Sequence, residues 1–397
     1  MKKLLTITLP AFVAALVILL ALVEVSVRVT WDPRKGRPGL FVADPVRTEK
    51  LAPHYDGWFA GVPVHVNALG FRDDRDYALA KGPRTCRIVV LGDSVTFGHG
   101  SIYEHTYPYL LEQRLKHWKP DVDWQVWNLG VPGYNTSQEL AYLLEVGPSY
   151  RPDLVIVGFF GNDVLENRSV EAPTRTAIVA SGIRSWLKRH MYSFDWYKKE
   201  YLTLRHRLLA SSTERDLLDN LAEQERLLVK PSTAGNLQEQ ALTNPAPRSD
   251  ADIERERCTH PEITTLSVEV IKRTPGLEAW KAGVRRFQEL HRTGAYRIMF
   301  FVNSAPDLCG NAGEDVFDPR VTKSIDDFHL QVLSDGTPAV SSHDAFARYR
   351  PSQVPNAGSH SLGNANVVKV QVLFEFLRER VLPALLADVE RRQARVS

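Results

Sequence analysis

A serine follows an apolar, strand-like run near residue 90, where its hydroxyl could act as a nucleophile. Residues 87–92 are Arg-Ile-Val-Val-Leu-Gly, and Asp93 and Ser94 follow them. Open α/β sheets bind ligands at the carboxyl ends of their strands, so a hydroxyl placed there could attack a substrate carbonyl. No Gly-Lys-Ser/Thr follows Gly92, and Thr96 stands where a Gly-x-Ser-x-Gly elbow needs glycine. The structural alternative is a serine that only caps a helix or turn.

Three further polar blocks follow in the chain. Asn128-Leu-Gly-Val-Pro-Gly133 comes after one strand-like segment, and Phe160-Gly-Asn162-Asp follows the very apolar residues 154–159. His360 precedes an amphipathic C-terminal segment. Taken singly, Asn162 could form an Asx turn, Gly133 could serve its turn, and His360 could be a solvated loop residue. Together they supply what acyl transfer needs, a hydroxyl, a base and donors for an oxyanion.

These blocks, in the order serine, glycine, asparagine and histidine, resemble those of the SGNH hydrolases, the GDSL-type esterase superfamily. The resemblance covers about residues 85–165 and 275–385. It implies that Ser94 is the nucleophile, that His360 is the general base, and that the Gly133 N–H and the Asn162 side-chain amide donate to the oxyanion. One such donor is worth roughly 3 to 4 kcal/mol of transition-state stabilisation.

The chain departs from the family pattern at two positions. The family usually has aspartate three residues before the histidine, where this chain has Ala357. Asp344 could orient His360 from a neighbouring loop, a backbone carbonyl could hold the imidazole instead, or catalysis could be weakened. Phe160 replaces a glycine that the family places before its asparagine. Another histidine, His99, lies just past the serine and is at most a pocket-lining residue.

The N-terminal segment is long and apolar enough to cross a membrane. Residues 4–23 contain no charge, and at about 1.5 Å per residue they would span about 30 Å. No small-x-small cleavage site follows the run, which favours an uncleaved signal anchor. The basic residues after the run outnumber Lys2 and Lys3 before it, against the positive-inside rule. Anchored relatives usually face outward, so we expect a single-pass protein of a bacterial inner membrane with an extracytoplasmic, periplasmic domain.

Composition is that of one large globular domain on a tether. The 397 residues are 44% hydrophobic and carry a formal net charge of +2, with no bias toward nucleic acid. Cys86 opens a strand and is expected to be buried, whereas Cys258 and Cys309 could pair if the domain is exported. The sequence contains no metal-ligand spacing and no dinucleotide fingerprint, so no cofactor and no metal are expected. It leaves the oligomeric state open.

Apolar periodicity predicts an α/β protein with a three-layer αβα, flavodoxin-like fold. We expect strands at 86–91, 124–128, 153–159, 297–303 and 338–342 in a five-stranded, mostly parallel sheet. Helices are expected near 104–117, 137–147 and 277–292, and from Asn364 until Pro383 kinks or ends the last one. Right-handed crossovers would bring Ser94, Asn162 and the Gly133 loop to one edge of this sheet.

Five segments follow from this organisation. They are an anchor (1–28), a pre-domain and linker (29–84), the first part of the hydrolase core (85–165), an insertion (166–275) and the second part of the core (276–390). The insertion is helical, basic and aromatic in its first half and irregular in its second. It could form a cap over the site, an element at the membrane surface, or a pad covering the sheet.

The sequence therefore predicts a membrane-anchored serine esterase. We expect a short acyl ester as substrate, such as an O-acetyl group on extracytoplasmic polysaccharide, an assignment that rests on analogy. An O-acetyltransferase using the same serine is the enzymatic alternative. A catalytically silent scaffold or glycan-binding protein is the alternative that Ala357 raises.

Overall fold

The computed structural model describes residues 2–31, 38–165, 167, 174–194, 197, 268–303, 319–346, 348–349, 354, 356–357 and 360–395. Cys258, Cys309 and most of the insertion lie outside the described residues. The N-terminal part contains α1 (Lys2–Thr30), β1 (Phe41–Asp44), β2 (Thr48–Leu51), β3 (Asp56–Phe59) and β4 (Val62–His65). The first part of the sheet region contains β5 (Thr85–Gly92), α2 (Ser94–Phe97), η2 (Tyr103–His105), α3 (Tyr107–Trp118), β6 (Asp123–Gly130), α4 (Thr136–Tyr150), β7 (Leu154–Phe159) and α5 (Asn162–Leu165).

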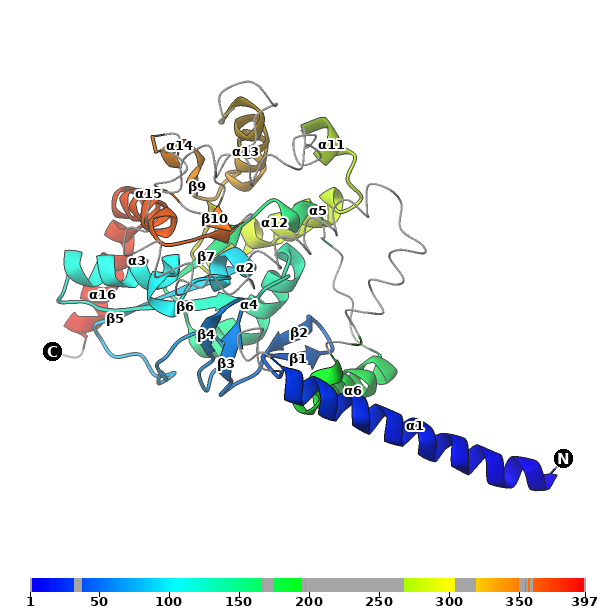
Figure 1. Cartoon of the computed structure of the whole chain (residues 1–397). Helices are drawn as coiled ribbons and strands as arrows, with labels where there is room; N and C mark the ends of the chain where they lie inside the picture. Colours follow the sequence, from blue (N-terminus) through cyan, green and yellow to red (C-terminus); the bar gives the residue numbers. More distant parts are fainter. Residues whose placement is uncertain are drawn as a thin grey trace.

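The elements after β7 complete the sheet and its covering helices (Figure 1). They are α6 (Arg175–His190), α11 (Val268–Lys272), α12 (Leu277–Arg292), β8 (Ile298–Val302), α13 (Pro319–Leu333), β9 (Ala339–Ser341) and α14 (His343–Phe346). The C-terminal elements are β10 (Asn356–Ala357), β11 (His360–Ser361), α15 (Asn364–Arg380) and α16 (Leu382–Ala394). Pro383 lies in the first turn of α16, so the helix predicted from Asn364 ends before this proline.

The central sheet has five strands in the order β6-β5-β7-β8-β9, and every neighbouring pair is parallel. All five lie within about two residues of the predicted strands, and the predicted αβα architecture is confirmed. Parallel strands joined by helices bury both faces, which is why β5 and β7 read as continuous apolar runs.

Alternate residues of each strand enter two separate cores. Val89 and Leu91 face the core that contains α4 and α12, whereas Ile88 and Val90 face the core that contains α3, α15 and α16. Cys86 belongs to the second core and is fully buried, as expected, and burial raises the pKa of its thiol to about 12. β5 is therefore buried along its whole length, and the half-buried Ser94 lies just past its carboxyl end.

The pre-domain forms two antiparallel hairpins, β1-β2 and β3-β4. Val42, Val64 and Phe71 are buried in the same apolar cluster as the β5 side chains Val89 and Leu91. The pre-domain thus extends the core beside the sheet, and α1 projects away from it (Figure 1).

Candidate active site

Ser94 is the first residue of α2, and only Asp93 separates it from the end of strand β5. The side chain of Asp93 caps this short helix by accepting a hydrogen bond from Val95 N at 2.8 Å. A buried strand that ends in a capped turn fixes the Ser94 backbone at the carboxyl edge of the sheet. The half-buried Ser94 hydroxyl therefore stands at the edge where the sequence places it.

Three glycines make room for this turn. Gly92 lies in register with Gly130 on one neighbouring strand and with Gly158 on the other. A Cβ added at Gly92 or Gly158 would lie 2.0 or 2.4 Å from Thr96 Oγ1, and one at Gly130 would lie 2.3 Å from Phe97 N. The strand ends carry glycine because α2 packs directly on them. Thr96, which stands where an elbow motif has glycine, fills the space above Gly92 and Gly158.

Arg72 from the pre-domain stabilises the C-terminal end of the turn that begins at Ser94. Its guanidinium donates hydrogen bonds to the carbonyls of Phe97 and Gly98 at 2.8 Å and to that of Ser101 at 2.6 Å. Carbonyls at a helix C-terminus lack helical partners and carry partial negative charge, so a buried cation there satisfies them. Burial lowers the pKa of Arg72 to about 10, and the group remains charged at neutral pH.

His360 meets Ser94 across a long sequence separation. Its Nε2 lies 2.8 Å from Ser94 Oγ, within hydrogen-bond reach for a general base. His360 begins β11, the second strand of a hairpin in which it pairs with Ala357. The buried amide of Asn366 donates to the carbonyls of His105 and Ser361, which fastens this hairpin to the start of α15.

The expected oxyanion donors follow the two strands that flank β5. Gly133 lies in the loop after β6, and Val131 N at the start of that loop donates to Gly92 O at 2.9 Å. Gly133 has a φ of +80°, is exposed, and has open space where a Cβ would stand. Asn162 opens α5 directly after β7. Because the strand order is β6-β5-β7, the loops carrying Gly133 and Asn162 lie on opposite sides of Ser94.

His99 contacts both Ser94 and His360 directly, so it is more than a residue that lines the pocket. Its ring stacks on the His360 ring with centroids 4.4 Å apart, and Phe59 from β3 contacts the His99 ring edge-on at 5.1 Å. Its backbone N–H donates to Ser94 O at 3.0 Å. Burial holds the pKa of His99 well below its usual value, and His360 and Arg72 add to this effect.

Asp344, the expected orienting acid, lies at the start of α14. Its carboxylate contacts His343 Nδ1 at 3.3 Å and Lys323 Nζ at 3.5 Å, and its side chain is 71% exposed. The described contacts of Asp344 are thus with these two residues. Ala357, the departure from the family pattern, is the cross-strand partner of His360.

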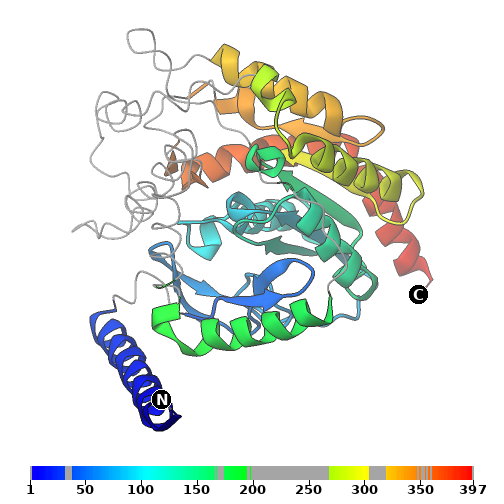
Figure 2. The same ribbon diagram turned by 90° about the vertical axis from the view of Figure 1, so that its right-hand side faces the viewer.

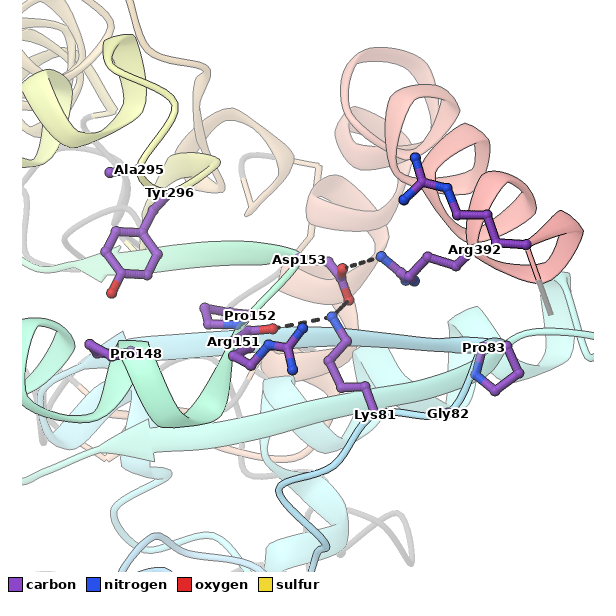
Figure 3. Close-up of a pocket in the computed structure, with 12 residues that line it drawn as sticks. Lys81, Gly82, Pro83, Pro148, Arg151, Pro152, Asp153, Ala295, Tyr296 and Arg392 are labelled. Atoms are coloured by element: carbon purple, nitrogen blue, oxygen red, sulfur yellow. Dashed lines mark hydrogen bonds and ion pairs between the residues drawn. The ribbon is translucent and has the colours of Figure 1, made fainter.

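A cavity of about 670 Å³ lies at the opposite, amino edge of the sheet. Asp153 is one of the residues that line it, and accepts hydrogen bonds from Lys81 at 2.5 Å and from Arg392 at 2.9 Å (Figure 3). Asp153 also accepts from Arg87 N, and Arg392 donates to Thr85 O. This network ties α16 to the start of β5 and is structural. Among the described residues, no cluster of three His, Cys, Asp or Glu side chains could hold a metal.

Sequence reasoning missed Arg72, Asn366 and the stacked position of His99. Each acts through groups far away in the chain, and only Asn67-Ala-Leu-Gly-Phe-Arg72 had an ordered-looking pattern. The position of Arg72 at the end of that segment is the one sequence signal for it, and its burial and its carbonyl partners appear only in the structure.

Comparison with known proteins gives a family for part of the chain. Residues 90–212 match the model of the GDSL-like Lipase/Acylhydrolase family. A search of curated proteins finds no significant match.

Several solved structures are similar at low identity. A two-domain esterase active on acetylated mannans, co-crystallised with mannopentaose, is 13% identical with a TM-score of 0.35. The match covers 74% of this chain and 49% of that one, so this chain spans about half of its length. A variant of an acetyl xylan esterase from Geobacillus stearothermophilus is 13% identical, with 75% and 96% covered and a TM-score of 0.37. An α/β hydrolase enzyme from the metagenome of Lake Arreo, Spain, is 13% identical, with 73% and 94% covered and a TM-score of 0.36.

Proposed function

We propose that the chain is a carboxylic ester hydrolase that works through a Ser94 acyl-enzyme, because residues 90–212 match the model of the GDSL-like Lipase/Acylhydrolase family. The observation that carries this proposal is the 2.8 Å contact between Ser94 Oγ and His360 Nε2. A hydroxyl hydrogen-bonded to an imidazole is the pair that nucleophilic acyl transfer needs.

The proposed reaction uses four residues. His360 Nε2 takes the Ser94 proton as Oγ bonds to the acyl carbon, and the carbonyl π electrons move to oxygen. The Gly133 N–H and the Asn162 amide donate to that oxyanion from its two sides. When the tetrahedral intermediate collapses, the ester C–O bond breaks and His360 gives its proton to the leaving alkoxide.

Water then releases the acyl group by the same steps, with water as the nucleophile and Ser94 as the leaving group. His360 removes a proton from water, the hydroxide attacks the acyl carbon, and Ser94 leaves with the returned proton. A sugar hydroxyl in place of water would make the protein an O-acetyltransferase. The two reactions use the same Ser94 and His360 and differ only in the molecule that accepts the acyl group.

We place the substrate among short acyl esters, with O-acetyl groups of extracytoplasmic carbohydrate as the first class to test. The family resemblance supports an ester. Acetylated mannan and acetylated xylan are useful test polymers because they are the substrates named for two of the similar structures.

Membrane anchoring by α1 belongs to the same proposal. The segment Pro10–Thr30 is long and apolar enough to cross a membrane or to act as a signal sequence, and none of it is buried. An exposed apolar helix of 21 residues is costly in water and stable in a bilayer. We propose that α1 remains as a single-pass anchor of a bacterial inner membrane, with the domain on its periplasmic side.

A fluorophosphonate probe tests the enzyme against the silent scaffold. The full-length protein in detergent should be labelled, and Ser94→Ala should abolish labelling while its melting curve stays unchanged. An ester panel from p-nitrophenyl acetate upward, with and without added oligosaccharide acceptors, then separates hydrolysis from transfer. Folded wild-type protein that resists the probe would leave the scaffold as the better reading.

A further inference from the structure

The helix α6 has one face buried against the domain and one apolar face exposed. On the buried side, Lys188 forms an ion pair with Glu49 of β2 and lies 5.7 Å from the centre of the Phe41 ring on β1. On the opposite side, three large apolar residues are 64%, 60% and 58% exposed, and they are Val179, Ile183 and Trp186. Their spacing of four and three residues places them in one stripe along the helix.

The end of α6 is fastened to α1 at a particular height. Glu24 accepts hydrogen bonds from the backbone N–H groups of Tyr192 and Ser193, at 3.0 and 2.9 Å, just after α6 ends. Arg28 donates to His190 O at 2.5 Å. Glu24 is the first charged residue after the apolar run of α1, so these bonds hold the end of α6 at the level where that run stops.

Figure 2 shows how α1 and α6 are arranged relative to the domain. α6 lies along the lower edge of the domain, beside the pre-domain hairpins, and α1 leaves from one end of it. If α1 crosses a bilayer, the surface of that bilayer meets the molecule at Glu24. α6 then lies at the membrane surface.

We propose that α6 is an interfacial helix whose Val179, Ile183 and Trp186 side chains insert into the headgroup and acyl boundary beside α1. This inference rests on the proposed anchoring by α1. Such helices bury their apolar face about 5 to 10 Å into the boundary, with tryptophan favoured at that depth.

The charge of α6 selects the lipid. Its sixteen residues contain four basic side chains and no acidic one. Lys188 pairs with Glu49, and Arg184, four residues earlier, lies on the same side of the helix as Lys188. Arg175 and Arg189, four residues before Val179 and three after Trp186, lie next to the apolar stripe and can contact the headgroups. Basic side chains beside an apolar stripe match an anionic lipid surface, and each one near the surface contributes to binding.

Two membrane contacts would fix the domain in a way that one helix cannot. A single span lets the domain rotate and tilt, whereas a span joined to a flat helix sets its height and tilt over the bilayer. The sequence left the basic, aromatic insertion open between a cap, a membrane-surface element and a pad. The structure favours the membrane surface for α6.

A fluorescence depth measurement tests the proposal in the full-length protein. Cys258→Ser and Cys309→Ser remove the other two cysteines, and the buried Cys86 is retained. Single cysteines are then introduced by Ile183→Cys, Val179→Cys, Leu16→Cys and Leu144→Cys, and are labelled with a polarity-sensitive dye. Leu144 is the matched control, an aliphatic residue on α4 that is 46% exposed. The proteins are placed in phosphatidylglycerol-containing nanodiscs with nitroxide-labelled lipids.

The proposal expects emission at 183 and 179 to be blue-shifted and quenched about twofold or more by nitroxides near the headgroup, as for a shallow interfacial position. The label at 16 should be quenched by nitroxides deep in the acyl chains, and the label at 144 by neither. A thermal melt of each labelled protein reports on the fold, and hydrolysis of p-nitrophenyl acetate reports separately on the proposed enzyme.

Each contrary outcome is distinct. One contrary result is that the label at 16 is quenched while the labels at 179 and 183 are as exposed to water as the label at 144. This result would overturn the interfacial helix but leave the anchor. A blue shift at 183 without lipid quenching would mean that protein covers the stripe, as in a second copy of the chain, and would also overturn it. Absence of quenching at 16 would remove the anchor and this inference together, whatever the esterase activity.

Discussion

The imidazole rings of His99 and His360 lie face to face, with centroids 4.4 Å apart and planes 22° apart. Burial lowers the pKa of His99 well below its usual value, so this ring stays neutral at the pH where an esterase works. In the proposed mechanism His360 takes the Ser94 proton, and its imidazolium then forms directly against a neutral π face. That face stabilises the charge and keeps the ring from rotating.

Replacing His99 should therefore slow the chemistry without weakening substrate binding. We expect His99→Ala to lower kcat about tenfold with KM unchanged, because an aromatic face next to a cation is worth about 0.5 to 2 kcal/mol. His99→Phe keeps a neutral ring and should recover most of kcat. If the two variants lose activity equally while melting like wild type, the stacked ring has no positioning role.

Asn162→Ala should lower kcat about a hundredfold or more, because it removes a donor that acts mainly in the transition state. Fluorophosphonate labelling at long incubation should still reach completion, since the dyad is intact. Steady-state kinetics with p-nitrophenyl acetate and a thermal melt check this together. Unchanged kcat in a normally folded variant would reduce Asn162 to a turn residue.

The orienting group of His360 can be tested from both candidate positions. Ala357 is the cross-strand partner of His360, and directly paired residues have Cβ atoms about 4.5 to 5.5 Å apart, so Ala357→Asp brings a carboxylate within reach of the imidazole. We expect this change to raise kcat up to about tenfold, well below the roughly ten-thousandfold effect of the aspartate in the serine-protease template. Lower kcat in a folded variant would show that another group already holds the ring.

Asp344→Asn should change kcat less than about twofold, because exposed carboxylates contribute little and this one contacts His343 and Lys323. The same p-nitrophenyl acetate assay measures it. A large loss would restore Asp344 as the orienting acid through a rearranged loop.

Stability should fall as the pH drops from 6.5 to 4. His329 is buried against Phe159, with ring centroids 4.8 Å apart, and burial lowers its pKa from 6.5 to about 4. In that window the unfolded chain binds a proton that the folded chain does not, so stability present at pH 7 is lost by up to about 3 kcal/mol below pH 4. Urea unfolding at pH 7 and pH 4.5 should show a smaller loss for His329→Phe than for wild type. Equal losses would exclude His329 as a source of this pH dependence.

The central sheet was predictable because its strands are buried on both faces. Runs such as residues 154–159 contain almost no polar residue, and each ends in a glycine or polar block that marks the carboxyl edge. Ser94 and His360 could be assigned from the family order of those blocks. Their 2.8 Å contact could not, because it depends on a hairpin whose pairing no local pattern shows.

Other parts required the tertiary structure. The strands of the pre-domain are four residues long, too short for a periodicity to emerge. The helix α13 follows a polar stretch and was not predicted. Arg72 reads as an ordinary surface arginine until the carbonyls of the nucleophile turn are placed around it.

Ser94 and His360, the proposed nucleophile and base, are separated by 266 residues, and this separation has a consequence for biosynthesis. When the ribosome has synthesised Arg72, Ser94 and the three glycines at the strand ends under α2, most of the chain before His360 is still to be made. Until then the serine has no partner to take its proton. On the proposed mechanism, a nascent or C-terminally truncated chain is therefore inert toward esters, and activity is acquired only when the last structural elements fold onto the first.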